Sequence, residues 1–234
     1  MSGIKLLHIN CSNMGSTGKI IDSINRALEE RGDKGFLCYE LGCDPRCENE
    51  YKISFRYESG IYRRINYWAG YPYAFAPLST AKLWRKIKEV QPDIIHFHCP
   101  NGNAINLYEL LKKIKAEGIP IVLTHHCEMF YTGACPYSYD CKQWMNGCKN
   151  CKHLEYVGPY HRNRVYVSWR KLYEAMRGNR ITAVSVSRWV YERSVQSPIL
   201  KEAENVVILN GVNCNRYSQV RYDIIIRSAP KKTP

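Results

Sequence analysis

Short apolar segments alternate with helical segments along most of this chain, and this alternation restricts the folds open to it. Segments with the apolar character of strands lie at residues 4–9, 35–41, 93–98, 119–125, 181–186 and 205–209. Apolar residues recur at helical spacing between them, at residues 16–32, 80–90, 104–117, 162–177 and 188–196. Strands separated by helices form parallel sheets that are covered on both faces. The sequence therefore predicts an α/β fold, a Rossmann-like parallel sheet with helices on both faces.

Some boundaries carry residues that typically begin or end a helix. Ser16 or Thr17 can accept hydrogen bonds from the first turn of the first helix, and Gly32 follows its last apolar residue. Residues 44–78 contain Tyr, Trp, Arg and Pro without a clear period. We expect an irregular excursion there, with one helix over residues 60–69.

Composition narrows the function classes. The chain has 234 residues, 45% of them hydrophobic, which is enough for a large core. No apolar run approaches the roughly 20 residues of a membrane span, and the first ten residues do not resemble a signal peptide. We therefore expect a cytoplasmic protein. The net charge of +13 favours an anionic partner, such as a nucleic acid, a phosphorylated ligand or an acidic membrane surface.

The loop after the first strand is the first candidate site, because ligands of open α/β sheets bind at the carboxyl ends of the strands. Gly15, Ser16, Thr17, Gly18 and Lys19 lie where the second element begins, and a helix N-terminus offers N–H groups to an anion. The loop does not fit the Walker A pattern, which requires Gly at position 13 and Ser or Thr at position 20. It is either a phosphate or sugar loop or an ordinary tight turn.

Histidines end the next two strands along the chain. Alternation places His96 and His98 on one side of their strand, and Asn101 and Gly102 follow in the same loop. His125 and His126 are adjacent, so they point to opposite faces and at most one of them faces a crevice. We take His98 as a candidate ligand-binding residue, although buried, hydrogen-bonded histidines would give the same pattern.

Glu128 follows this histidine pair closely. A carboxylate there could orient an imidazole, provided that the loop turns back toward the strand.

Four cysteines follow within one loop: Cys135, Cys141, Cys148 and Cys151. Four thiolates form a tetrahedral structural zinc site and would close a loop that has no core of its own. Such a site has no open position for water, so the zinc would not be catalytic. Disulfides and free thiols are the alternatives, although an odd total of 11 cysteines without a signal peptide favours a reducing compartment.

The sequence resembles the N-terminal domain of a family-four, GT-B type retaining glycosyltransferase of bacterial surface polysaccharide synthesis. The matching stretches are HINCSNMGSTGKI, PDIIHFHCPNG, IPIVLTHHCEMFYTGACPYSYDCKQWMNGCKNC, AVSVSRW and VVILNGVN. The third stretch is the most specific, because related enzymes carry a histidine, Thr-Gly, cysteines and a tryptophan at this spacing. The resemblance covers residues 1–217 as one domain with a cysteine-rich loop, and residues 218–234 read as an irregular basic tail.

The resemblance implies a cytoplasmic glycosyltransferase, peripheral on the inner face of the membrane. It uses a sugar nucleotide and a glycan or lipid-linked acceptor and requires no cofactor for its chemistry. His126 occupies the position of the family's histidine and would hydrogen bond the donor sugar near the reacting carbon. The stretch from Gly15 to Gly18 would approach the donor phosphates or the acceptor.

Further positions follow from the same resemblance. Ser187 and Arg188 would lie near the crevice between two domains, and Asn210 and Gly211 would begin the hinge. Cys127 stands directly after His126, at a position where the family usually carries an Asp. The chain ends near that hinge, so we expect an acceptor-binding half with weak or no activity alone.

Two other classes of function remain open at this stage. Residues 57–75 and the basic helix near residues 162–171 could bind an anionic membrane or a lipid-linked saccharide without catalysis. A zinc-stabilised nucleic-acid binder would explain the charge and the cysteines. We expect nucleic acid not to be the partner, because the cysteines follow a Rossmann-type strand without a base-reading helix.

Overall fold

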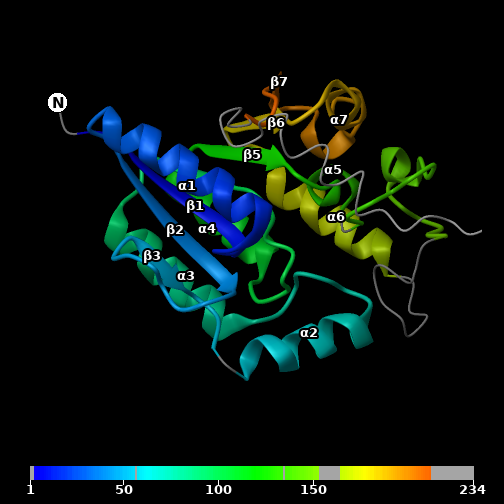
Figure 1. Ribbon diagram of the computed structural model, residues 1–234. Coiled ribbons are helices and arrows are strands. Elements are labelled where there is room, and N and C mark those ends of the chain that lie inside the picture. The colour runs from blue at the N-terminus through cyan, green and yellow to red at the C-terminus, as the bar shows by residue number, and fades with distance from the viewer. Residues whose placement is uncertain (1–2, 56, 134, 153–163, 212–234) are drawn as a thin grey trace, which may run out of the picture.

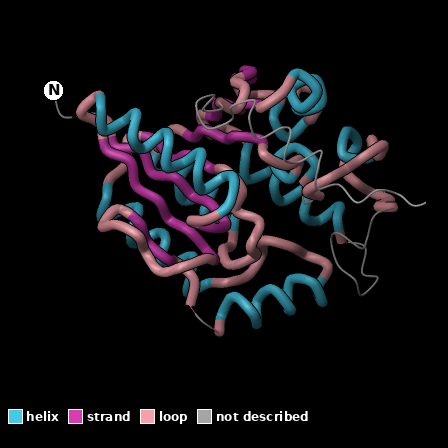
Figure 2. Tube along the Cα trace, viewed as in Figure 1, coloured by secondary structure: helices cyan, strands magenta, loops and turns pink. Residues whose placement is uncertain are grey.

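The computed structural model describes residues 3–55, 57–133, 135–152 and 164–211. A seven-stranded sheet forms its centre, with the order β3-β2-β1-β4-β5-β6-β7 and parallel pairing throughout. The strands are β1 (Lys5–Ser12), β2 (Lys34–Leu41), β3 (Glu50–Lys52), β4 (Ile94–Phe97), β5 (Ile121–His125), β6 (Ile181–Ser185) and β7 (Glu204–Val207). Figures 1 and 2 show this sheet with its helices. The predicted Rossmann-like α/β fold is confirmed.

The α-helices of the described residues connect these strands. They are α1 (Gly15–Glu30), α2 (Glu58–Ala69), α3 (Pro77–Val90), α4 (Leu107–Glu117), α5 (Met129–Thr132), α6 (Val165–Met176) and α7 (Arg188–Ser194). Two 3₁₀ turns, η1 (Gln143–Asn146) and η3 (Pro198–Leu200), complete the set. Within the described part of the chain, no helix combines the length and the apolar character that a membrane crossing requires.

The two faces of the sheet differ in what covers them. Ile21 of α1 packs with Leu37 and Tyr39 of β2 on one face. The main core lies on the other face, where apolar side chains of α3, α4 and α6 meet the sheet. At β1 and β4, the core side is apolar, with Ile9 and Phe97, whereas the opposite side carries the buried polar side chains of His8, Asn10 and His96. Polar side chains are therefore buried at the centre of the molecule.

The strand order places a ligand crevice at the centre of the sheet. From β1 the chain moves outward to β2 and β3, then returns past β1 to β4 and continues to β7. The direction of winding thus reverses between β1 and β4. In open α/β sheets the crevice lies outside the carboxyl ends of the strands at such a reversal. The loops after β1 and β4 border it.

The excursion over residues 44–78 contains more regular structure than expected. It includes the short strand β3, which has too few residues to produce a period in the sequence, and the helix α2. Buried Glu58 accepts hydrogen bonds from the backbone N–H groups of Leu78 and Ser79, each at 3.0 Å. These are N–H groups of the first turn of α3, which has no side-chain cap of its own. A side chain of the excursion therefore explains why α3 begins at Pro77 and not at the predicted residue 80.

The predicted cap of α1 is wrong. Met14 occupies the N-cap position without a side-chain hydrogen bond to the helix. The hydroxyl of Thr17 instead accepts a hydrogen bond from Asn10 Nδ2 at 3.0 Å. At the other end, Gly32 has φ +80°, a left-handed conformation that favours glycine, as predicted.

Candidate functional site

Three histidines, one in β1 and one directly after each of β4 and β5, form a series of hydrogen bonds at the polar face of the sheet. His8 Nδ1 lies 3.0 Å from His98 Nε2, and His98 Nδ1 lies 3.2 Å from His126 Nε2. The rings of His98 and His126 are nearly parallel, with an interplanar angle of 14°. His8 and His98 are buried, whereas His126 is half-buried. The network therefore leads from the interior of the sheet to its carboxyl edge.

Two further histidines follow the expected alternation. His96 lies on the same side as His98, and its Nε2 lies 2.8 Å from Thr124 Oγ1. A ring nitrogen of His96 also lies within 4.8 Å of ring nitrogens of His8 and His98. His125 points to the other face, where its ring contacts Phe130 and Tyr131. The predictions that His96 and His98 share a side and that His125 and His126 diverge thus agree with the structure.

Burial keeps these imidazoles neutral. It lowers the pKa of His8 to about 4 and that of His125 to about 3. The pKa values of His96 and His98 lie well below the usual range, because of burial first and the neighbouring imidazoles second. Burial also lowers the pKa of His126. Each ring therefore has one donor and one acceptor nitrogen at neutral pH, which suits hydrogen bonding to an uncharged partner.

A cavity of about 310 Å³ opens next to this network. Its lining is formed by His125, His126, Cys127, Glu128, Tyr137, Tyr139, Val186, Trp189 and Val190. The expectation that at most one histidine of the adjacent pair faces a crevice is wrong, because the cavity lies where β5 ends and both residues border it. More than half of the surface of Tyr137, Tyr139 and Trp189 is exposed. Aromatic walls with few polar groups are typical of small-molecule sites.

Glu128 does not orient an imidazole in this structure, because its carboxylate has other partners. Arg193 Nε and the hydroxyl of Tyr131 donate to Glu128 Oε1 at 2.9 Å and 2.7 Å, and the backbone N–H of Ser138 donates to Oε2. The Arg193 guanidinium also lies over the rings of Trp144 and Trp189, at 5.3 Å and 4.7 Å from their centroids. The carboxylate thereby joins the cysteine-rich loop to α7 and fixes one wall of the cavity.

The loop from Gly15 to Lys19 lies at the same edge, beyond the lining of the cavity. Gly15 and Ser16 are exposed at the start of α1, and Gly18 is buried. A Cβ atom on Gly18 would lie 2.8 Å from the carbonyl oxygen of Asn13, so the turn requires glycine there. Asn10 links this loop to β4, since its side chain bonds Thr17 and accepts the N–H of Cys99 at 3.1 Å.

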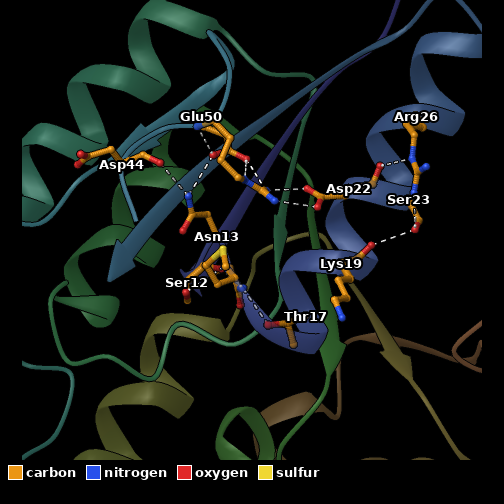
Figure 3. A network of polar contacts seen from close by, with 12 residues as sticks. Ser12, Asn13, Thr17, Lys19, Asp22, Ser23, Arg26, Asp44 and Glu50 are labelled. Atoms are coloured by element: carbon orange, nitrogen blue, oxygen red, sulfur yellow. Dashed lines mark hydrogen bonds and ion pairs between the residues drawn. The ribbon is translucent and has the colours of Figure 1, made fainter. Parts of the chain in front are cut away.

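A second set of contacts fixes the same loop from the side of β3. Figure 3 shows Asn13 reaching Glu50 and the backbone carbonyl of Asp44. Arg46 binds both carboxylate oxygens of Asp22 on α1, at 2.8 Å and 3.0 Å, and it also binds Glu50. The start of α1, where Gly15 and Ser16 are exposed, is therefore held in place by polar contacts on both sides.

Gly102 lies against a buried carboxyl group that the sequence analysis missed. A Cβ atom on Gly102 would lie 2.4 Å from Glu40 Oε2 and 3.1 Å from Cys11 Sγ. Glu40 Oε2 accepts the backbone N–H of Ala104 at 2.9 Å, while Oε1 is buried without a hydrogen bond. Burial raises the pKa of Glu40 to about 7. A glutamate within an apolar strand was the feature of the sequence that could have indicated Glu40. Its burial, however, depends on the loop of Gly102, which packs on the carboxyl group.

The other predicted substrate residues lie around these groups. Asn101 is exposed and lines a separate cavity of about 150 Å³. Ser187 is the N-cap of α7, where its hydroxyl accepts the N–H of Val190 at 3.2 Å, and exposed Arg188 begins that helix next to the cavity wall. Asn210 and Gly211 are exposed beyond β7, and none of the described cavities includes them. The structure therefore brings His98 and His126 into contact. Ser187 and Arg188 lie beside the same cavity, whereas Asn101 lines a different one and Asn210 and Gly211 line none of the described cavities.

The cysteine-rich loop is anchored by aromatic residues, contrary to the expectation that it has no core. Trp144 is buried, packs edge-on against Tyr131 and donates to the carbonyl of Cys141 at 2.8 Å. Trp169 of α6 donates to the carbonyl of Trp144 at 2.8 Å. The fold of this loop therefore has an explanation without a metal ion.

The four cysteines fit zinc in donor type but not in spacing. Burial, and then the neighbouring thiols of the same group, raise the pKa values of Cys135 and Cys148 to about 12. Cys135 Sγ and Cys148 Sγ donate to the carbonyls of Tyr137 and Thr132. Among the residues that the structure describes, the four do not bring three sulfurs within 4.8 Å of one another. A tetrahedral site would require them to move closer, so structural zinc stays a prediction.

A cavity of about 460 Å³ lies away from this region. Ile181, the first residue of β6, lines it, together with residues of α6 and η3. It is larger than the histidine cavity, but it lies at the amino end of β6 and contains none of the predicted site residues. Polar groups capable of chemistry gather at the opposite edge of the sheet.

Comparison with known proteins gives one family. The model of Glycosyltransferase Family 4 matches residues 18–216, a range that includes the histidine network apart from His8 and the whole cavity. A comparison with curated proteins gives no match. The match covers most of the 234 residues, and the parallel α/β fold agrees with it. The chain therefore belongs to glycosyltransferase family 4.

Proposed function

We propose that this chain provides the acceptor-side domain of a retaining glycosyltransferase of bacterial surface polysaccharide synthesis. The donor is a sugar nucleotide, and the acceptor is a glycan or a lipid-linked saccharide. The main support is the position of His126, which is held by His98 at the carboxyl edge of the sheet and lines the 310 Å³ cavity. Its place in a family-four domain supports the same assignment.

The chemistry assigned to His126 is hydrogen bonding. Its Nε2 is bound to His98, so Nδ1 is the ring nitrogen that remains for a sugar hydroxyl. The ring is neutral at neutral pH, because burial lowers its pKa. The exposed rings of Tyr137, Tyr139 and Trp189 offer apolar surfaces to the carbon side of a sugar. A sugar bound in this way presents its reacting carbon at the edge of the sheet.

The transfer itself requires charge stabilisation more than a protein base. The acceptor attacks on the same face that the diphosphate leaves, and the leaving phosphate helps to remove the proton from the acceptor hydroxyl. The N–H groups at Gly15 and Ser16 begin α1 and are exposed at this edge, where they can stabilise a departing phosphate. We expect this step to need no cofactor.

The test is sugar transfer with the purified chain and a panel of labelled sugar nucleotides, with a lipid extract as the source of acceptor. His126→Ala is expected to lower transfer or donor hydrolysis by about 100-fold, as for other hydrogen-bond donors that act in the transition state. Lys201→Ala, in the distant 460 Å³ cavity, is the control and retains activity. Normal turnover by a correctly folded His126→Ala chain would remove this histidine from the site. Because we expect weak turnover from this half alone, binding of the labelled donor and of the lipid-linked acceptor is measured as well. A chain that shows no turnover and binds neither of them would contradict the function.

A second proposal concerns the membrane, and it comes from the outer surface of α2. Ile61, Ile65 and Trp68 are exposed there at helical spacing, and Trp68 has 57% of its surface accessible. Arg63 and Arg64 are exposed on the same helix, whereas its one acidic residue, Glu58, is buried. Apolar and basic side chains that share an exposed helix are typical of peripheral binding to anionic lipids. We propose that α2 contacts an anionic bilayer and so brings the site to a lipid-linked acceptor.

Vesicle sedimentation tests this contact. The chain is expected to bind vesicles that contain phosphatidylglycerol and to bind much less to neutral phosphatidylcholine vesicles. Trp68→Ser with Ile61→Ser weakens the binding, while Ile208→Ser, an equally exposed isoleucine beyond β7, does not. Equal binding by the α2 variant and the unaltered chain would contradict the proposal.

A further inference from the structure

Two cysteine thiols meet next to the histidine network. Cys99 Sγ lies 3.6 Å from Cys127 Sγ, one residue beyond the hydrogen bond between His98 and His126. Both cysteines are half-buried. The segments that follow β4 and β5 therefore pair through two successive residues, first by their imidazoles and then by their thiols.

The backbone explains this pairing. In the sheet, Phe97 of β4 lies opposite Leu123 of β5. The N–H of His126 then donates to the carbonyl of Thr124 at 3.0 Å, which makes a tight turn. The side chains of the two segments pair at one constant separation of 28 residues, His96 with Thr124, His98 with His126 and Cys99 with Cys127. The hydrogen bond from the Cys99 N–H to Asn10 Oδ1 holds the other partner.

The two thiols have different proton affinities. The hydrogen bond with Cys127, followed by burial, raises the pKa of Cys99 well above its usual range. The hydrogen bond from Cys99 lowers the pKa of Cys127; burial opposes this shift, and the backbone N–H of Met129 adds to it. Cys127 is therefore the better thiolate of the pair, and Cys99 holds the proton. A thiolate is the nucleophile in exchange with disulfides.

Small reagents can reach this pair from solvent. Cys127 lines the 310 Å³ cavity together with the exposed rings of Tyr137, Tyr139 and Trp189. A third cysteine, Cys11, lies at the same edge, where its N–H donates to the carbonyl of Cys99 at 2.9 Å. Burial, with nearby Glu40, raises the pKa of Cys11 to about 12. Cys11 therefore stays protonated and serves as a matched comparison for the pair.

We propose that Cys99 and Cys127 form a reactive dithiol that reduces small-molecule disulfides and closes into an intramolecular disulfide. The Cys127 thiolate attacks one sulfur of the reagent, forms a mixed disulfide and releases one thiolate. Cys99 then loses its proton to solvent, and its sulfur attacks Cys127 Sγ, which releases the second thiolate. Both released thiolates take up protons, so one small disulfide becomes two thiols while two protein thiols become one disulfide. The sulfurs must approach from 3.6 Å to about 2.05 Å.

The test uses the full chain with oxidised glutathione, followed by alkylation of the remaining thiols and peptide mass mapping. Digestion with trypsin and chymotrypsin separates Cys127 from Cys135, because Phe130 and Tyr131 lie between them. We expect a cross-linked peptide that joins Cys99 to Cys127. Cys99→Ser loses the cross-link and retains a glutathione adduct on Cys127. Cys127→Ser loses both products, whereas Cys11→Ser forms the cross-link as the unaltered chain does.

Three results would overturn the inference. In the first, Cys99 and Cys127 are both alkylated under conditions in which exposed Cys43 carries glutathione. In the second, the unaltered chain accumulates glutathione on Cys127 without closing the bond to Cys99. In the third, the cross-link disappears in Cys11→Ser. Because the readout is a bond between two peptides, its failure is independent of sugar transfer.

Discussion

Glu40 shows how strongly one buried side chain can depend on pH. It lies in β2 without exposed surface, and the loop of Gly102 packs on its carboxyl group. Burial raises its pKa from 4.5 to about 7, and the N–H of Ala104 offsets this only in part. In the unfolded chain the carboxyl group ionises at its ordinary pKa. The stability that neutral Glu40 contributes is therefore complete below about pH 4.5 and is lost as the pH rises through about 7.

Glu40→Gln is expected to remove this pH dependence. The amide keeps an oxygen for Ala104 and cannot ionise, so the variant gains stability relative to the unaltered chain as the pH rises. The gain at pH 8 is on the order of 3 kcal/mol, from the size of the pKa shift. Urea unfolding at pH 5 and pH 8 measures it, and Glu109→Gln on the surface of α4 is the control. A difference that is the same at both pH values would show that Glu40 is not neutral when buried.

At the scale of elements, side chains from elsewhere in the chain bind the first turn of α3 and hold the cysteine-rich loop. Glu58 of α2 accepts two N–H groups from the first turn of α3, and Glu128 joins the cysteine-rich loop to Arg193 of α7. Amphipathic spacing predicted α3 and α7, but it does not show which distant carboxylate binds the N–H groups or the arginine of each helix. α3 therefore begins at Pro77 and not at the predicted residue 80, whereas α7 begins at Arg188 as predicted.

Glu58→Ala is expected to destabilise the protein by about 1–2 kcal/mol, the usual effect of losing a helix cap. The side chain is buried, and its loss leaves the N–H groups of Leu78 and Ser79 without their acceptor. Glu89→Ala on α3, the helix that Glu58 caps, is the control, because that carboxylate is exposed and forms a surface ion pair with Lys86. Denaturant unfolding followed by circular dichroism measures both. Equal effects from the two substitutions would mean that Glu58 does not cap α3.

At the scale of the whole molecule, the cysteine-rich loop raises the question of a bound ion. Structural zinc at Cys135, Cys141, Cys148 and Cys151 predicts about one zinc per chain after purification in reducing buffer. Cys148→Ser should lose that zinc, while exposed Cys43→Ser retains it. Elemental analysis with thiol counting decides between the outcomes. A metal-free protein in which all four thiols react would show that Trp144 and its neighbours hold the loop without an ion.

The sequence by itself determined the class of fold and the sides of the sheet on which residues lie. Alternating strands and helices predicted a parallel sheet, and the two-residue period placed His96 and His98 together, because these patterns depend on neighbours along the chain. Other features join residues that are distant in sequence. Examples are the hydrogen-bonded series of His8, His98 and His126, the 3.6 Å contact between the sulfurs of Cys99 and Cys127, and the bond between Glu128 and Arg193. They depend on strand order, on the register of β4 with β5 and on how the following loops fold, and only the tertiary structure decided these.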